Sequence, residues 1–307
     1  MHILVTGGCG FIGQHLVRRL VQNQHTVTII DSLIGSDGNS THHPDTKLVI
    51  ADVREAQTWS HVLHNIDAIV HLAAASNVAH SVENPQYDFD VNVRGCFEVL
   101  LAAKNAGVPK FILASSNAPI GKQPPPAHER LAPQPISPYG ASKLAGEAYC
   151  QAFNGSYGTE TIALRFANVF GSGSMHKTSV VARFIRDILD KRRITVYGDG
   201  SQTRDFIHVQ DIVTGIEHAL NASNIGGEVV QLGTGIETSV NQLIKILQEI
   251  IPFDFSVDYL PKRIGDVQRN FSQIEKACRL FGFSPQINLR DGIEETYNWF
   301  EGQLGHG

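Results

Sequence analysis

The sequence predicts an α/β fold: a doubly wound parallel sheet with helices on both faces, followed by a smaller C-terminal α/β domain. Three observations predict it. Short apolar runs typical of buried strands alternate with longer stretches of helical periodicity through the first half of the chain. A glycine-rich turn directly follows the first apolar run. Beyond residue 171 the alternation becomes less regular, which indicates a second domain.

Periodicity and turn residues predict the elements in order. Gly107 and Pro109 close a long helix, because glycine suits a helix C-terminus and proline cannot continue the helix. Seven of the 13 prolines fall between 119 and 138, so this stretch is a stiffened loop. Strands are expected over 1–5, 26–30, 47–50, 68–71, 110–114, 161–166 and 194–197. Helices are expected over 11–21, 54–64, 84–105, 139–153, 179–191, 240–251 (capped by Ser239) and 292–300.

Composition limits the function. The 307 residues are 42% hydrophobic and carry a net charge of −5, which argues against a nucleic-acid or membrane-surface partner. Met1 leads straight into the first strand, so no signal peptide is expected. The four cysteines lack CxxC spacing, and we expect buried free thiols in a cytoplasmic protein. The 14 histidines lack ligand spacing, and no metal site is predicted.

The turn at 6–13 reads TGGCGFIG and stands between a strand and a helix. Glycines at 7, 10 and 13 allow a tight turn, a close approach to a pyrophosphate and close packing of helix on sheet. The helix N-terminus offers free N–H groups to the anion. Asp31 ends the second strand, 18 residues beyond Gly13. A carboxylate there suits a ribose 2′-OH and repels a 2′-phosphate, so the motif predicts NAD rather than NADP.

Tyr139 and Lys143 are four residues apart and lie on one face of the predicted helix. We expect the ammonium, with the positive nicotinamide of NAD⁺, to lower the pKa of the phenol and make it a usable base. Ser116 ends a strand, where its hydroxyl can relay a proton to a reacting oxygen. Alone, the pair would be an ordinary surface pair; after a dinucleotide motif it predicts a catalytic group.

Several ordered motifs resemble the NAD-dependent epimerase/dehydratase family, within the extended short-chain dehydrogenase/reductase superfamily, whose members act on nucleotide sugars. The resemblance covers residues 1 to about 270 and implies a Rossmann-type fold with NAD held throughout turnover. It rests on TGGCGFIG (6–13), Asp31, ADV (51–53), HLAAASNV (71–78), NVRG (92–95), SSNAPIG (115–121), SPYGASK (137–143), LRFANVFG (164–171), VYGDG…TRDFIHVQD (196–211) and RIGD (263–266).

The resemblance implies roles residue by residue. The catalytic group would be Ser116, Tyr139 and Lys143. NAD would be held by Gly7, Gly10, Phe11, Ile12, Gly13, Asp31, Ser32, Asp52, Val53, Leu72, Ala73, Ala74, Asn92, Ser115, Tyr139 and Lys143. The substrate would be held by Ser76, Ser116, Asn117, Tyr139, Asn168, Lys177, Thr178, Ser179, Val196, Tyr197, Arg204, Arg263 and Asp266, with the arginines on phosphate oxygens. Arg263 also suits a surface salt bridge.

Residues 117 and 118 discriminate within the family. Dehydratases and decarboxylases carry an acidic residue two places past the catalytic hydroxyl, where this chain has Ala118. Alanine cannot move a proton, which favours a UDP-hexose 4-epimerase over a dehydratase or net oxidoreductase; an NAD-sensing regulatory protein is the non-enzyme alternative. The family's Val-Tyr-Gly is replaced by Pro119-Ile120-Gly121, which removes an aromatic beside the sugar.

The sugar stays open between glucose/galactose, N-acetylhexosamine and hexuronic acid pairs. Lys177 with Thr178 and Ser179 either caps the next helix or receives an anionic group such as a C6 carboxylate. We expect an NAD-binding domain over 1–171, with 205–235 packing back on it, and a substrate-binding domain over 172–307. The resemblance implies a homodimer through helices 84–105 and 139–153.

Overall fold

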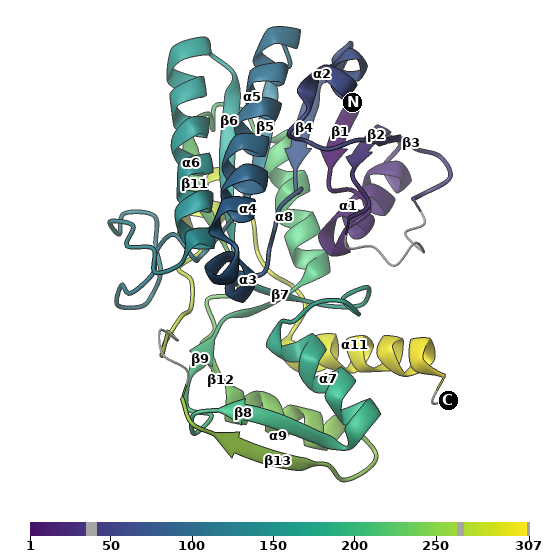
Figure 1. Cartoon of the computed structure of the whole chain (residues 1–307), viewed down its shortest axis with the longest axis vertical. Coiled ribbons are helices and arrows are strands. Elements are labelled where there is room, and N and C mark those ends of the chain that lie inside the picture. The colour runs from purple at the N-terminus through teal and green to yellow at the C-terminus, as the bar shows by residue number, and fades with distance from the viewer. Residues whose placement is uncertain (35–41, 263–266, 306–307) are drawn as a thin grey trace.

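The computed structural model describes residues 1–34, 42–262 and 267–305. Its centre is a seven-stranded sheet in the order β11-β6-β5-β4-β1-β2-β3, in which every neighbouring pair is parallel (Figure 1). The strands are β1 (His2–Thr6), β2 (Thr26–Asp31), β3 (Lys47–Ile50), β4 (Ala68–His71), β5 (Lys110–Ser116), β6 (Glu160–Phe166) and β11 (Glu228–Leu232). The predicted doubly wound α/β fold is confirmed.

Helices cover both faces of this sheet, and each face has its own core. One face packs on α1 (Phe11–Gln22) and α8 (Val209–Asn221). The other packs on α5 (Gly95–Ala106) and α6 (Pro138–Tyr157), with Trp59 and Phe111 fully buried between them and the sheet. Because both faces are covered, the strands are apolar almost throughout, as parallel strands must be.

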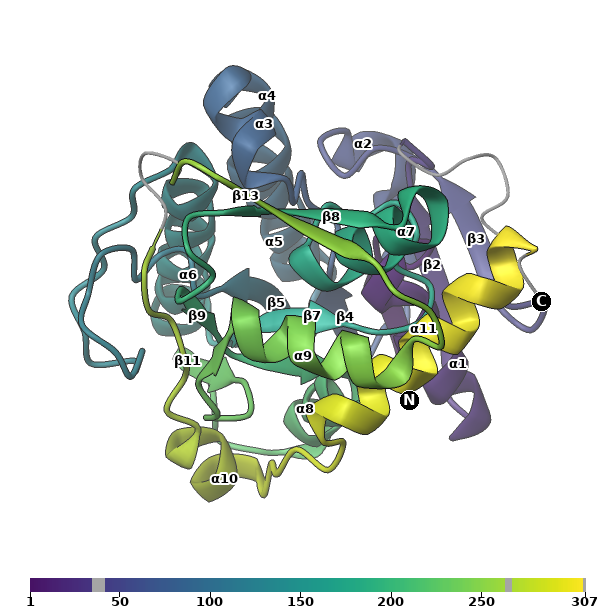
Figure 2. The same ribbon diagram turned by 90° about the horizontal axis from the view of Figure 1, so that it is seen from below.

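A smaller lobe lies below the sheet in Figure 1 and has a third core. A parallel pair, β8 (Arg193–Tyr197) with β13 (Ser256–Leu260), packs with three helices, α7 (Val180–Lys191), α9 (Val240–Ile250) and α11 (Leu289–Leu304) (Figure 2). Short pairs link the lobes: β7 (Asn168–Phe170) with β10 (Phe206–His208), and β9 (Thr203–Arg204) with β12 (Thr238–Ser239). Helix α10 (Glu275–Phe281) packs on β11.

Several elements differ from the expected ranges. The helix expected over 84–105 comprises α4 (Pro85–Phe89), a π-helical turn (Asp90–Arg94) and α5, and ends at Gly107 with φ 71°. The helix expected over 54–64 is shorter, a single α turn, α2 (Ala56–Trp59), followed by a 3₁₀ turn (Ser60–Leu63). Helix α3 (Val78–Glu83) was not predicted. Cys278 is exposed, so the expectation that all four thiols are buried is wrong.

No helix among the described residues is both long enough and apolar enough to cross a membrane.

Candidate active site

The glycine turn between β1 and α1 has room for a ligand but not for side chains. A Cβ on Gly13 would lie 2.2 Å from the carbonyl oxygen of Gly7, and one on Gly7 would lie 2.6 Å from the amide nitrogen of Ala73. Gly7 also has φ +71°, which favours glycine. Gly10 is the N-cap of α1 and offers no side chain, so first-turn N–H groups remain for an anion. This backbone cradle fits the pyrophosphate of NAD.

Asp31 holds this turn in place as well as ending β2. Its Oδ2 accepts from the Cys9 amide at 2.9 Å, and its Oδ1 accepts from the Leu33 amide at 2.9 Å. Carboxylate oxygens each have a further acceptor position, so the ribose role predicted for Asp31 is compatible with this anchoring role. The anchoring role was not predicted from the sequence.

The loop after β4 lies directly beside the glycine turn, as parallel neighbouring strands require. The Leu72 amide donates to the Thr6 carbonyl oxygen at 3.0 Å. Asn92 fixes the same loop: its Oδ1 accepts from the Ala75 amide at 2.9 Å and its Nδ2 donates to the Ala75 carbonyl at 3.0 Å. Asn92 therefore acts on the loop expected to face the pyrophosphate, and its side chain is 4% exposed.

On the side expected to hold the adenine, Asp52 is engaged by Arg54. The guanidinium donates to both carboxylate oxygens, at 2.9 and 2.6 Å, and this hydrogen bonding holds the pKa of Asp52 below its usual value. The Asp52 carbonyl accepts from the Trp59 indole at 3.0 Å, and Val53 is buried beside it. Asp52 thus shapes this corner of the sheet, and its contact with adenine stays a prediction.

The three residues expected to be catalytic lie together where β5 ends against α6. Ser137 caps α6, so Tyr139 and Lys143 fall on consecutive turns that face the sheet, 9% and 6% exposed. The Lys143 Nζ lies 5.8 Å from the Tyr139 ring centre and donates to the Ala114 carbonyl at 2.9 Å. Ser116 Oγ accepts from the Ala118 amide at 3.1 Å, and its hydroxyl also forms a hydrogen bond with Tyr139.

The lowering of the Tyr139 pKa is expected from Lys143 together with bound NAD⁺ and stays a prediction; the protein's own groups by themselves act in the opposite direction. Burial and the charge of Asp88 outweigh the hydrogen bond with Ser116, and the pKa of Tyr139 is raised to about 12. Burial likewise lowers the pKa of Lys143 to about 8, partly offset by the carboxylates of Asp88 and Glu147. Burial of the two side chains is therefore the largest influence on both pKa values, and the sequence motif does not reveal this burial.

Acidic residues behind the catalytic helix were missed by the sequence analysis. Asp88, 1% exposed, accepts from Ser142 Oγ and from Asn92 Nδ2 at 2.8 Å, tying α4 to α6. Glu147 lies one turn beyond Lys143 and pairs with Arg165 of β6. The only available sequence signal was the four-residue spacing from Lys143 to Glu147 and from Asp88 to Asn92.

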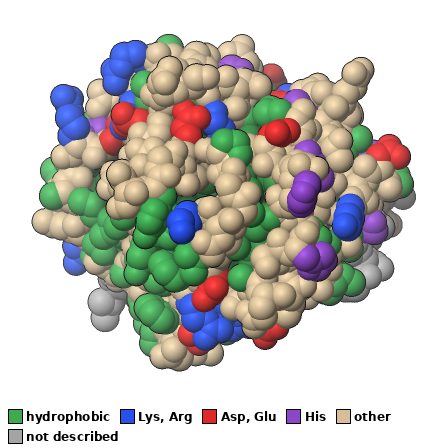
Figure 3. Space-filling model, turned by 90° about the horizontal axis from the view of Figure 1, so that it is seen from above, with side chains coloured by type: hydrophobic (Ala, Val, Ile, Leu, Met, Phe, Trp, Pro, Cys, Tyr) green, Lys and Arg blue, Asp and Glu red, His purple; other side chains and the backbone are tan. Residues whose placement is uncertain are grey.

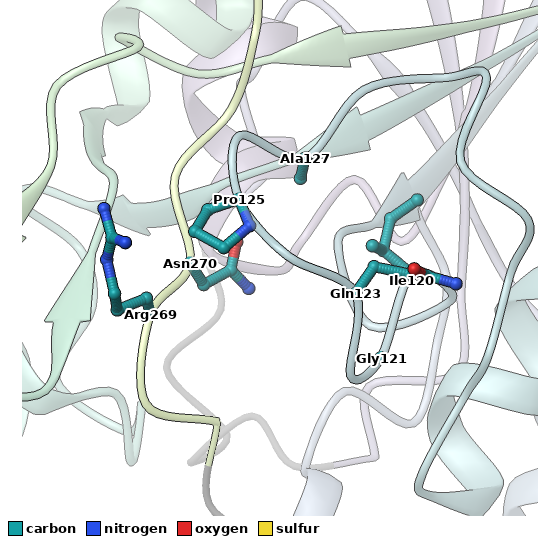
Figure 4. Close-up of a pocket in the computed structure, with 7 residues that line it drawn as sticks. All are labelled: Ile120, Gly121, Gln123, Pro125, Ala127, Arg269 and Asn270. Atoms are coloured by element: carbon teal, nitrogen blue, oxygen red, sulfur yellow. The ribbon is translucent and has the colours of Figure 1, made fainter.

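Asn117 is the clearest of the predicted substrate residues. Its Nδ2 donates to Ser272 Oγ at 3.0 Å, whereas its buried Oδ1 has no hydrogen-bond partner among the described residues. A buried acceptor without a partner is costly, so a ligand hydroxyl or amide suits it. Asn117 Nδ2 also donates to Asn270 Oδ1 at 3.4 Å. Asn270 lines a small pocket with Ile120, Gly121, Gln123, Pro125, Ala127 and Arg269 (Figure 4).

The other predicted substrate residues come from segments of both lobes. Lys177 Nζ reaches across to Ser76 Oγ at 3.1 Å. Ser179 is the N-cap of α7, but its side chain makes no capping hydrogen bond. Arg204 Nη1 donates to the Thr203 and Val267 carbonyls at 2.7 and 2.8 Å. Asn168 lies in β7, Val196 and Tyr197 end β8, and Thr178 is exposed. The calls on Arg263 and Asp266 lie outside the described residues.

Comparison with known proteins identifies the family. The model of the NAD-dependent epimerase/dehydratase family matches residues 3–233. This chain belongs to that family. It is 38% identical to a putative UDP-glucose 4-epimerase of Methanocaldococcus jannaschii, over 97% of this chain and 98% of the relative.

Solved structures of this family superpose closely on the chain. The Thermotoga maritima UDP-glucose 4-epimerase, solved with UDP-glucose, matches with a TM-score of 0.94 and 34% identity, over 99% of this chain and all of that one. The Bacillus cereus UDP-glucuronic acid 4-epimerase, solved with UDP-glucuronic acid and NAD, matches with a TM-score of 0.92 and 30% identity, over 99% and 100%. This chain is an NAD-dependent enzyme of the isomerase class.

Proposed function

We propose that this family member is a UDP-hexose 4-epimerase that works through a 4-keto intermediate. The observation that carries the proposal is the group formed by the buried Tyr139 and Lys143 with Ser116, and Ala118 in place of an acid. The relatives named above, for UDP-glucose and for UDP-glucuronic acid, support the nucleotide and the reaction. Domain roles follow: 1–171 with 205–235 would hold NAD, and the remainder the sugar nucleotide.

Each side chain has one task in this reaction. NAD, when bound, accepts the C4 hydride and returns it, and its positive charge favours the Tyr139 phenolate against burial. Tyr139 takes the proton of the 4-hydroxyl, and Ser116 donates a hydrogen bond to the same oxygen. Lys143 keeps a positive charge beside the phenol while bonded to the Ala114 carbonyl. Asn117 Oδ1 accepts a hydrogen bond from the sugar. Enclosure between the lobes retains the ketone until hydride returns to the other face.

Dehydration and net oxidation are the alternatives within the family. Removing water across C5–C6 needs a further acid or base near the sugar, and Ala118 occupies the position where the family places it. An NAD-sensing regulatory protein would have no use for a buried phenol beside an ammonium. These alternatives predict a 4-keto-6-deoxy product, net NADH production or no chemistry, respectively.

The test is to incubate the purified protein with UDP-glucose, UDP-N-acetylglucosamine and UDP-glucuronic acid, and to resolve the C4 epimers. The expected result is interconversion of at least one pair without net change in NAD. Tyr139→Phe should lower kcat by orders of magnitude while NAD affinity is retained. Absence of C4 isomerisation for every UDP-sugar would refute the proposal.

We also propose that the chain forms a homodimer through α5 and α6. Seen from above, hydrophobic side chains gather over these two helices (Figure 3). Tyr149 and Tyr157 of α6 are 38% and 56% exposed there, next to the partly buried Phe97 of α5. Exposed aromatic clusters of this kind suit a self-complementary interface. Light scattering should give twice the chain mass, and Tyr149→Lys should shift the protein toward a monomer.

A further inference from the structure

The backbone at Lys177 is held in place by a side chain of α7. Lys177 lies three residues ahead of α7, in the segment that joins the two lobes. Arg186 of α7 donates to the carbonyls of Met175 and Lys177, the latter at 3.2 Å. This clamp fixes the backbone from which the Lys177 side chain extends, so the ammonium has a defined position.

The ammonium of Lys177 contacts the main domain. Lys177 Nζ donates to Ser76 Oγ at 3.1 Å, on the loop that follows β4 at the carboxyl edge of the sheet. Its charge also acts on Lys143, where it contributes to lowering the pKa of that group. Geometry also links the two sites: Ala75, next to Ser76, is bonded to Asn92, and Asn92 and Ser142 both donate to Asp88. The Lys177 ammonium therefore lies on a loop that is tied to the helix carrying Tyr139 and Lys143.

The surroundings of Lys177 have an excess of positive charge. No ion pair joins Lys177 to a carboxylate in the described part of the chain, and burial lowers the pKa of Lys177. The buried carboxylates of Asp88 and Glu147 already accept hydrogen bonds from other side chains. A partly buried ammonium without a counter-ion is unfavourable, and a negatively charged ligand would offset that cost.

The chemistry of the sugar identifies which negative group fits. In a UDP-hexose the diphosphate is attached at C1, on the far side of the ring from C4. The reacting C4 must lie at Tyr139, so an ammonium on the Ser76 loop at the same edge of the sheet is expected near the substituents of C3 and C5. C5 carries C6, and a C6 carboxylate is the anionic group that a hexuronic acid presents there.

We infer that Lys177, whose ammonium is bonded to Ser76, binds the C6 carboxylate of a UDP-hexuronic acid and makes this enzyme prefer that substrate to a neutral hexose. The inference rests on the 4-epimerase function proposed above. Lys177 is then a specificity-determining residue. Removing its charge weakens the binding of the uronic acid substrate and leaves the binding of the neutral sugar substrate nearly unchanged.

The experiment compares kcat/KM for UDP-glucuronic acid and UDP-glucose in the holoenzyme and three variants. Lys177→Met removes the charge at similar length, and Lys177→Arg keeps a cation. Lys191→Met is the control, since Lys191 ends the same helix, is 62% exposed and pairs with Asp187 on the surface. Binding of UDP-glucuronic acid is measured by calorimetry in parallel, so that affinity and turnover are read separately.

We expect the unmodified enzyme to prefer UDP-glucuronic acid. Lys177→Met should lower kcat/KM for that substrate by about 10- to 100-fold and change kcat/KM for UDP-glucose by less than about threefold. Lys177→Arg should keep part of the preference, and Lys191→Met all of it. Equal losses on both substrates, no loss on UDP-glucuronic acid, or a preference for UDP-glucose in the unmodified enzyme would overturn the inference with the epimerase function intact. Failure of every UDP-sugar to isomerise would instead refute the proposed function.

Discussion

Glu147→Gln should destabilise this protein strongly, because the carboxylate neutralises a buried guanidinium. Glu147 and Arg165 are 2% and 3% exposed, and the two nitrogens Nε and Nη2 of Arg165 donate to Glu147 at 2.8 and 2.6 Å. Arg165 Nη1 has no hydrogen-bond partner among the described residues, so the carboxylate provides most of the compensation for this charge. Removing one partner of a buried ion pair costs about 3–5 kcal/mol.

At about 2–4 °C per kcal/mol for a large domain, that loss corresponds to a fall in Tm of roughly 10 °C. Calorimetric scans at one fixed rate, with NAD at saturation, would measure it. Ser115→Ala is the matched control: it removes only the hydroxyl that donates to Glu147 and should cost about 1 kcal/mol. The double variant Glu147→Leu with Arg165→Met should recover most of the loss, since apolar side chains of similar volume replace buried ion pairs well. A single-variant loss below about 1 kcal/mol, or a double variant no more stable than the single, would refute this reasoning.

Three further outcomes follow from local geometry. Gly13→Ala should lower Tm and abolish NAD binding, because the new Cβ would lie 2.2 Å from the Gly7 oxygen. Gly10→Ala places its Cβ 3.3 Å from the same oxygen, so it should weaken NAD binding with little change in the Tm of the NAD-free protein. Equal losses of Tm in the two variants would contradict this. Because burial lowers the pKa of Lys143 to about 8, kcat/KM should fall as the pH rises through about 8, and a flat profile to pH 10 would exclude the role of its charge. Ser239→Ala removes the capping box of α9 and should cost about 1 kcal/mol in chemical denaturation, with activity unchanged.

The cofactor cradle could be predicted from the sequence because its parts are close together in the chain. Turn, helix start and Asp31 fall within 31 residues, and the steric need for glycine at positions 7 and 13 is confirmed by the structure. The spacing of Tyr139 and Lys143 predicted that they share one face of a helix, and their catalytic role was predicted only together with the dinucleotide motif and Ser116. Six of the seven strands of the main sheet were predictable because burial on both faces makes parallel strands continuous apolar runs, whereas β11 was not among the expected strands.

The features that the sequence did not predict depend mainly on contacts between segments that are distant in the chain. The raised pKa of Tyr139 comes from burial and from Asp88 on another helix, neither visible in the spacing of the motif. Glu147 meets Arg165 only because β6 lies beside α6. The π-helical turn at Asp90–Arg94 adds a residue to one turn, which a helical period does not reveal.

The position of β11 at one edge of the main sheet affects how the protein folds during its synthesis. Strand β11 is the last strand of that sheet to leave the ribosome, after the residues of β8 and β10, which belong to other sheets, have already emerged. Until residue 232 has emerged, β6 presents an unpaired backbone edge to any passing chain. A nascent chain halted near residue 171 would therefore be prone to aggregate, and truncation there should not yield a free-standing nucleotide-binding module.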